Sequence, residues 1–276
     1  MNFIKKIIFK LFKIVSIFFK KNVSLTVENQ NQRRFGNFAK LVGEENFCKI
    51  QQSHIAVVGV GGVGSWAAES LVRCGIGKLT LIDLDSVAIS NTNRQLTALS
   101  STFGEPKVAV LKERFLQINP HLKIVTVEDF LTNENCSAIL PANLNGILDC
   151  TDDIPAKIAL ILWAKKNKIP LIVSGGAGGK SDPTLIRTGD LAQSKNDALL
   201  ASLRSRLRRL HGFPKAEKAT KMKIPVIFSI EPMQRPSFCE SGRLNCAGLG
   251  SSVAVAASFG NAAAALLLKK ITKAKG

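Results

Sequence analysis

Short runs of apolar residues alternate with helix-like segments along the middle of the chain. Runs typical of strands buried on both faces of a sheet occupy residues 54–60, 79–83, 122–128, 146–149 and 170–174. Helices are predicted between them, at residues 61–75 and 154–167. Because strands and helices alternate, the sequence predicts an α/β fold built on a doubly wound, mostly parallel sheet.

The pattern becomes less regular after residue 175. Two further strands are predicted at residues 183–191 and 224–230, and a basic helix at 197–209. The stretch 247–268 carries no charge and is long enough to span a membrane, but its glycine, serine and alanine content makes it weakly hydrophobic. A helix buried against the sheet explains it better. The predicted fold is therefore a Rossmann-like sheet with a C-terminal antiparallel elaboration.

Residues 1–21 have a different pattern, with six lysines and no acidic residue. On a helical wheel the lysines face one side and isoleucine, leucine, valine and phenylalanine the other, which is typical of a basic helix lying on an anionic bilayer. Packing on the protein itself or on a partner subunit is the alternative. We expect an N-terminal extension at residues 1–30, one domain at 31–276, and a cytoplasmic protein that residues 1–21 could attach to the inner face of the membrane.

The composition narrows the classes of function. Lysine and arginine total 38 against 20 acidic residues, giving a formal net charge of +18, which favours a polyanionic partner such as RNA, nucleotide phosphates or an anionic membrane. Tyrosine is absent, so no mechanism can use a tyrosine acid or base. The six cysteines form no C-x-x-C pair, so the sequence gives no support for a four-cysteine zinc site.

A glycine-rich turn follows the first predicted strand. Gly59, Gly61, Gly62 and Gly64 lie in a G-x-G-x-x-G arrangement, which lets backbone N–H groups at a helix N-terminus approach a phosphate. Asp83, at the end of the second strand, can accept hydrogen bonds from ribose hydroxyls. Asp85 follows as a second nucleotide-site carboxylate, with a structural role as the alternative.

The residues that follow the next strands favour ATP over a nicotinamide cofactor. They supply amides, cations and a carboxylate at strand ends that should line one crevice, namely Asn91, Arg94, Gln95, Lys107 and Asp152. A triphosphate requires cations and an aspartate to hold Mg²⁺, whereas hydride transfer requires a flat, apolar pocket. An NAD-dependent oxidoreductase and a nucleotide-binding module without turnover remain alternatives.

These motifs resemble those of the ubiquitin-activating-enzyme-type adenylyltransferases. The resemblance is carried by residues 59–64, 81–85 (LIDLD), 91–95 (NTNRQ), 104–107, 118–120 (INP) and 149–152. It is closer to the tRNA-modifying dehydratase branch at Arg34-Phe35-Gly36 and at residues 61–68, 167–170, 175–179, 182–183 and 246–248. It implies an ATP- and Mg²⁺-dependent enzyme that adenylates the threonyl carboxylate of threonylcarbamoyladenosine in tRNA and then closes a ring with loss of water.

The resemblance also implies roles for individual residues. Arg94, Lys107 and Asp152 would be catalytic, with Asp152 also holding the metal, and Cys246 could act as a nucleophile or be a structural thiol. The family's dimers imply a homodimer in which Arg34, or alternatively Arg33, reaches the neighbouring subunit's site. Relatives of this kind imply sulfur-mobilising protein partners. Arginines of the basic helix would contact RNA, namely Arg204, Arg206, Arg208 and Arg209.

A second substrate is open within the same family. Relatives that activate the C-terminal glycine of a sulfur-carrier protein usually have asparagine after the site aspartate, where this chain has Asp153. They also carry paired C-x-x-C motifs, which this chain lacks. Both departures weaken the sulfur-carrier alternative and leave the tRNA hypothesis intact.

Overall fold

The computed structural model describes residues 31–215, 220–234 and 249–273 and divides into two units, residues 1–47 and 48–276. In the first unit, residues 31–42 are helical and α2 (Glu44–Gln52) begins. Phe35, Ala39 and Phe47 form a small buried cluster there. The predicted amphipathic helix at residues 1–21 lies outside the described residues, so the division at residue 30 stays a prediction.

The second unit is built on a seven-stranded sheet in the order β3-β2-β1-β4-β5-β7-β6. The strands are β1 (His54–Val58), β2 (Lys78–Ile82), β3 (Lys123–Val127), β4 (Gly146–Asp149), β5 (Leu171–Ser174), β6 (Ile186–Asp190) and β7 (Pro225–Ser229). All neighbouring pairs are parallel except β6 and β7, which are antiparallel. The predicted mostly parallel sheet with a C-terminal antiparallel elaboration is confirmed.

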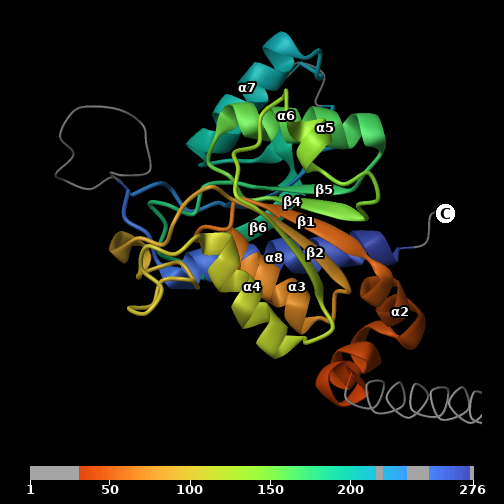
Figure 1. Cartoon of the computed structure of the whole chain (residues 1–276). Coiled ribbons are helices and arrows are strands. Elements are labelled where there is room, and N and C mark those ends of the chain that lie inside the picture. The colour runs from red at the N-terminus through yellow and green to blue at the C-terminus, as the bar shows by residue number, and fades with distance from the viewer. Residues whose placement is uncertain (1–30, 216–219, 235–248, 274–276) are drawn as a thin grey trace, which may run out of the picture. The chain divides into compact units, whose positions relative to one another are not determined.

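Helices cover both faces of this sheet (Figure 1). One layer contains α3 (Gly64–Arg73), α4 (Lys107–Ile118) and α8 (Val253–Thr272), and the other contains α5 (Cys136–Ile139), α6 (Ile154–Asn167) and α7 (Ala198–Leu210). Short 3-10 helices lie at η1 (Ile89–Asn91), η2 (Pro183–Leu185) and η3 (Leu191–Gln193). The chain leaves β1 toward β2 on one side and returns to β4 on the other, so the strand order reverses between β1 and β4, and open α/β sheets bind ligands at the carboxyl ends of such strands.

The last helix, α8, is a core element. Val255, Phe259, Ala263 and Leu267 are buried along it. A side chain at Gly260 would place its Cβ 2.5 Å from the Val63 oxygen, so the glycine lets α8 approach α3 closely. By length and composition alone α8 could cross a membrane, with a mean hydropathy of 1.3. Its buried face confirms the predicted helix against the sheet, although α8 begins at Val253 and not at residue 247.

Several boundaries differ from the sequence predictions for local reasons. The predicted strand at 183–191 begins only at Ile186, because Pro183–Leu185 forms a 3-10 turn capped by Asp182, whose carboxylate accepts from the Thr184 N–H. The helix predicted from residue 61 begins at Gly64, because the preceding glycines form the turn itself. Helix α4 was not predicted.

Candidate active site

The glycine-rich turn brings the end of β1, the start of α3 and the end of β4 together. Gly59 has a φ of +78°, and a Cβ there would lie 2.9 Å from the Thr151 nitrogen. A Cβ on Gly64 would lie only 1.8 Å from the Gly59 oxygen. No other residue fits either position without moving backbone. The turn therefore presents the N-terminus of α3, whose first N–H groups have no acceptor within the helix and favour an anion.

Asp83 ties this turn to the end of β2. Its Oδ2 accepts a hydrogen bond from the Val60 N–H (2.7 Å), and its Oδ1 accepts one from the Asp85 N–H (2.9 Å). Burial raises the pKa of Asp83, an effect that the nearby Lys107 ammonium and these two N–H donors oppose. The carboxylate fixes the glycine turn and leaves further acceptor positions on the same oxygens for a ligand.

Lys107 begins α4 and lies between two carboxylates. Its Nζ is 2.6 Å from Asp85 Oδ2 and 3.9 Å from Asp83 Oδ1, and its side chain is 6% exposed. The structure therefore brings Asp83, Asp85 and Lys107 together at the end of β2, as the sequence predicted. The Lys107 ammonium thus lies within ion-pair distance of both carboxylates.

The segment from Asn91 to Gln95 lies over the glycine turn. A Cβ on Gly61 would contact Gln95 Nε2 at 3.7 Å, and one on Gly62 would contact Arg94 Cγ at 3.3 Å. Gln95 is buried, and its Oε1 has no hydrogen-bond partner in the described part of the chain. Asn91 shapes the segment itself, because its Oδ1 accepts from the Ala88 N–H at 3.0 Å. Arg94 and Gln95 are thus the members of this motif that face the turn.

Hydrogen bonds of its side chain and of its backbone hold Arg94 in place. Its Nη1 donates to the Ser90 carbonyl (2.8 Å) and to Asn93 Oδ1 (3.0 Å). The indole N–H of Trp66, on α3, donates to the Arg94 carbonyl at 3.0 Å. Arg94 as a whole is half-buried, and its guanidinium keeps further N–H donors for an anion.

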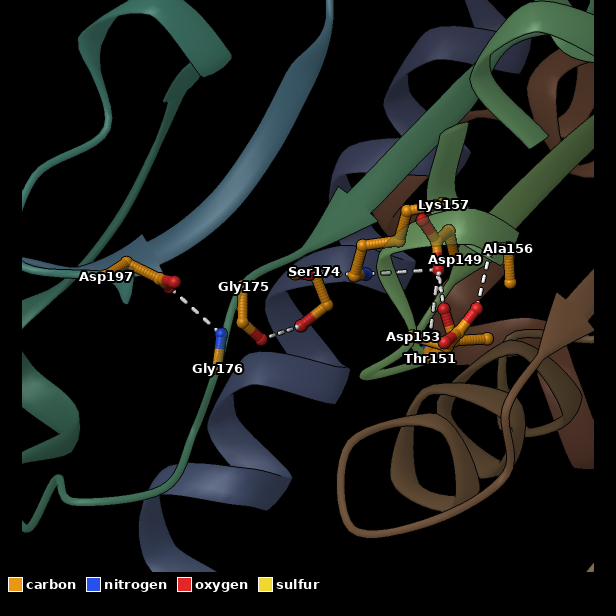
Figure 2. A network of polar contacts seen from close by, with 9 residues as sticks. All are labelled: Asp149, Thr151, Asp153, Ala156, Lys157, Ser174, Gly175, Gly176 and Asp197. Atoms are coloured by element: carbon orange, nitrogen blue, oxygen red, sulfur yellow. Dashed lines mark hydrogen bonds and ion pairs between the residues drawn. The ribbon is translucent and has the colours of Figure 1, made fainter. Parts of the chain in front are cut away.

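A buried ion pair, shown in Figure 2, lies beneath the ends of β4 and β5. Lys157 Nζ, on α6, donates to Asp149 Oδ1 (3.1 Å) and to the Ser174 carbonyl (2.9 Å), and both charged side chains are fully buried. Asp149 Oδ1 also accepts from the Thr151 hydroxyl at 2.8 Å. The sequence did not predict this role for Lys157, whose only signal is a lone cation in the apolar first part of the helix, well before Lys165 and Lys166.

Two aspartates follow β4 and have different roles. Asp153 caps α6, since its Oδ2 accepts from the Ala156 N–H at 2.8 Å (Figure 2). Aspartate and asparagine cap helices equally well, so Asp153 in place of asparagine keeps this role. Asp152 is exposed, and within the described residues no hydrogen bond or ion pair holds its side chain.

Residues 175–179 form a second glycine-rich segment, directly after β5. Asp197, the N-cap of α7, accepts from the Gly176 N–H (2.9 Å) and from the Leu200 N–H (2.9 Å). Burial raises the pKa of Asp197, and these two donors oppose it. The Gly179 N–H donates to the Gly250 carbonyl at 2.8 Å, which ties the segment to the chain leading into α8.

For two of the remaining predicted residues the structure gives no position relative to this site. Cys246 lies outside the described residues. Arg34 belongs to the first unit, whereas the glycine turn belongs to the second. Of the four arginines predicted to contact RNA, Arg206 and Arg209 are exposed, whereas Arg204 and Arg208 donate hydrogen bonds to carbonyl groups of the protein.

The donor set fits a magnesium ion that arrives with a nucleotide, but not a metal held by protein alone. Among the described residues, no group of three or more His, Cys, Asp or Glu side chains could hold a metal ion. Mg²⁺ commonly binds one or two carboxylates and completes its shell with water and substrate phosphates. Asp152, which follows the carboxyl end of β4, is suited to that arrangement.

Comparison with known proteins agrees with this geometry. The chain is 40% identical over 258 residues to the tRNA threonylcarbamoyladenosine dehydratase of Haemophilus influenzae, covering 92% of this chain and 98% of that one. The Escherichia coli protein of the same name is 41% identical over 261 residues, covering 90% and 97%. The crystal structure of the E. coli dehydratase in complex with ATP is similar, with a TM-score of 0.80 over 87% of this chain and 94% of that one.

A protein-family model also matches most of the chain. The ThiF family matches residues 34–275, which include the glycine turn, all seven strands and α8. With its parallel sheet, its glycine turn and its similarity to the tRNA threonylcarbamoyladenosine dehydratases over nearly their whole length, the chain belongs to the ThiF family.

Proposed function

We propose that this protein is an ATP-dependent dehydratase that converts threonylcarbamoyladenosine in tRNA into its cyclic form. The observation that carries the proposal is the placement of Arg94 and Gln95 over the glycine turn, beside the Asp83–Lys107 pair. The similarity to dehydratases of this name over more than 90% of their length supports the choice of substrate.

The reaction has two steps. An oxygen of the threonyl carboxylate attacks the α-phosphorus of ATP, the bond to the β-phosphate breaks, and pyrophosphate leaves with the electron pair. A nitrogen or oxygen of the carbamoyl group then attacks the activated carbonyl carbon, and AMP leaves as the group loses a proton. ATP thus becomes AMP and pyrophosphate, while the nucleoside loses the elements of water.

The residues of the chain lower the barrier by screening charge and fixing geometry. Carboxylate and triphosphate are both anions, so the cations Arg94 and Lys107 and the N-terminus of α3 reduce their repulsion and hold them in line. Asp83 suits the ribose hydroxyls. The Oε1 of Gln95, which has no partner among the described residues, is an acceptor buried beside the turn. Asp152 would hold Mg²⁺, which supplies charge neutralisation on the phosphates.

The assembly and location belong to the same proposal. The family resemblance supports a homodimer in which Arg34 completes the partner's site, and sulfur-mobilising proteins are proposed as further partners. A tRNA substrate supports action in the cytoplasm, with residues 1–21 as a peripheral membrane anchor.

Purified protein incubated with ATP, Mg²⁺ and tRNA carrying threonylcarbamoyladenosine tests the proposal. We expect mass spectrometry of the nucleosides to show the loss of one water, with AMP released in equal amount. Asp152→Ala should reduce the rate by several orders of magnitude, whereas Asp153→Asn, which keeps the helix cap, should retain it.

A sulfur-carrier protein is the second candidate substrate. Pyrophosphate exchange stimulated only by such a carrier, with no change in the tRNA nucleoside, would refute the proposal in favour of that alternative. Oxidation or reduction of a nicotinamide cofactor without ATP consumption would refute both.

A further inference from the structure

We propose that exposed cations at the C-terminal ends of α6 and α7 bind backbone phosphates of the tRNA, away from the nucleotide that reacts. This inference rests on the proposed function. The surface, called here the distal basic surface, consists of Lys165, Lys166, Lys168, Arg206, Arg209 and Lys215, all of them exposed.

The ends of the two helices lie side by side. The Lys165 ammonium, in the last turn of α6, stands 4.5 Å from the centre of the Phe213 ring, which follows α7. The Arg208 Nε–H, in the last turn of α7, donates to the Pro214 carbonyl at 3.0 Å. These interactions join the end of α6 to the segment that carries Lys215, so the exposed cations belong to one continuous region.

The two segments of the chain that carry these cations contain no acidic residue. Neither Asp nor Glu occurs between Asp153 and Asp182, or between Asp197 and Glu217. The other helix layer differs, because Glu69 on α3 binds both Arg73 (2.8 Å) and Arg114 (2.5 Å).

The structure separates the arginines of α7 by role. Arg204 Nη1 donates to the Leu191 carbonyl (3.1 Å) and to Ser194 Oγ (2.7 Å), which holds α7 to η3. Arg208 is likewise engaged, by the carbonyl of Pro214. Arg206 and Arg209 are exposed to solvent, and no hydrogen bond or ion pair engages them in the part of the chain that is described. Two of the four predicted arginines are therefore structural.

The distance of this surface from the active site indicates a long polyanion. Helix α7 begins beside the site, where its N-cap Asp197 binds the Gly176 N–H. Its 13 residues span about 20 Å, so the basic end lies too far away to touch ATP bound at the glycine turn. A polymer of phosphates, such as the stem of a tRNA, is long enough to reach the glycine turn and the distal basic surface at the same time.

The apolar residues of α7 argue against a membrane as the partner. An interfacial helix needs its apolar face free to enter the lipid. Leu200, Leu203 and Leu207 are fully buried in the core, and Leu210 is the exposed leucine at the end of α7. The surface therefore offers charge without an insertable face, which suits phosphates in solution.

Two double variants test the surface, Arg206→Gln/Arg209→Gln on α7 and Lys166→Gln/Lys168→Asn on α6. Asparagine is chosen because Lys168 has a φ of 57°, a conformation that asparagine tolerates. The matched control is Lys112→Gln/Lys270→Gln, which removes the same charge from exposed positions on α4 and α8 in the other layer. The full chain is used throughout.

The measurement is the dissociation constant for tRNA carrying threonylcarbamoyladenosine, by fluorescence anisotropy at several salt concentrations. Each surface variant should bind about 10-fold more weakly or worse. The slope of log K against log salt should become shallower by about 1 for each phosphate that the variant no longer neutralises. ATP affinity should not change, and the control should bind tRNA as the wild type does.

Several results would overturn the inference. Unchanged tRNA affinity in both surface variants would do so, as would an equal loss in the control. Binding to anionic phospholipid vesicles through these residues, with tRNA affinity intact, would reassign the surface to a membrane. Failure of the proposed function is distinguishable, because it appears as wild-type protein that forms no cyclic nucleoside whatever its affinity for tRNA.

Discussion

Replacing Lys157 with methionine should destabilise the protein more than any change at an exposed position. The substitution removes the ammonium that donates to Asp149 Oδ1 and to the Ser174 carbonyl, and leaves a carboxylate with no exposed surface. Asp149 Oδ1 would keep the Thr151 N–H and hydroxyl, but its Oδ2 already lacks a partner among the described residues.

The size of the effect follows from the burial of both groups. Breaking a fully buried pair by removing one member costs about 3–5 kcal/mol, against a total stability of about 5–15 kcal/mol for a typical protein. Asp149→Asn combined with Lys157→Met removes the orphaned charge, so we expect the double variant to be more stable than the Lys157→Met single variant. The expected coupling between the two positions is about 2–3 kcal/mol.

Urea unfolding followed by tryptophan fluorescence measures these free energies. The two tryptophans suit this purpose, since Trp66 lies on α3 and Trp163 on α6, in opposite helix layers. A loss below about 1 kcal/mol for Lys157→Met, or additive losses in the double variant, would show that the pair does not behave as a buried ion pair.

Three further predictions concern the glycine turn, the α3–α4 interface and the thiols. Gly64→Ala should abolish ATP binding in calorimetry because its Cβ would overlap the Gly59 oxygen, whereas Gly61→Ala, with ordinary van der Waals distances, should retain it. Burial works to raise the pKa of Glu69, but hydrogen bonds from two arginines outweigh it and lower the pKa. Glu69 therefore stabilises the fold above about pH 4.3, the usual glutamate value, and this contribution is lost as pH falls through the folded pKa. Glu69→Gln should cost about 1.5–3 kcal/mol in urea unfolding at pH 7 and progressively less in acid; a pH-independent cost would contradict this. Burial raises the pKa of the Cys150 thiol to about 12, so iodoacetamide at pH 8 should label exposed Cys48 and leave Cys150 unlabelled in native protein, as mass spectrometry of the peptides can show.

The elements that the sequence determined depend on neighbours along the chain. The strand at Gly146–Asp149 and the helix at Ile154–Asn167 occur at the residues that the pattern predicted, since burial on both faces and a helix cap are local signals. The glycine turn is equally local, because the φ of Gly59 and the approach of Gly64 to it involve residues five positions apart. Helix α4 escaped prediction because a short run such as VAVL fits strand and helix alike.

What the tertiary structure decided depends on partners that lie on different elements of the fold, 8 to 17 residues apart in the examples that follow. Lys157 joins the ends of β4 and β5, and nothing near it in the chain shows that its charge is buried with Asp149. The basic helix predicts four equivalent arginines, but only the folded chain brings the Ser194 hydroxyl to Arg204 and leaves Arg206 in solvent. The physical reason is that periodicity and turn geometry act over a few residues, whereas burial, ion pairing and exposure are set by whichever distant segments pack alongside.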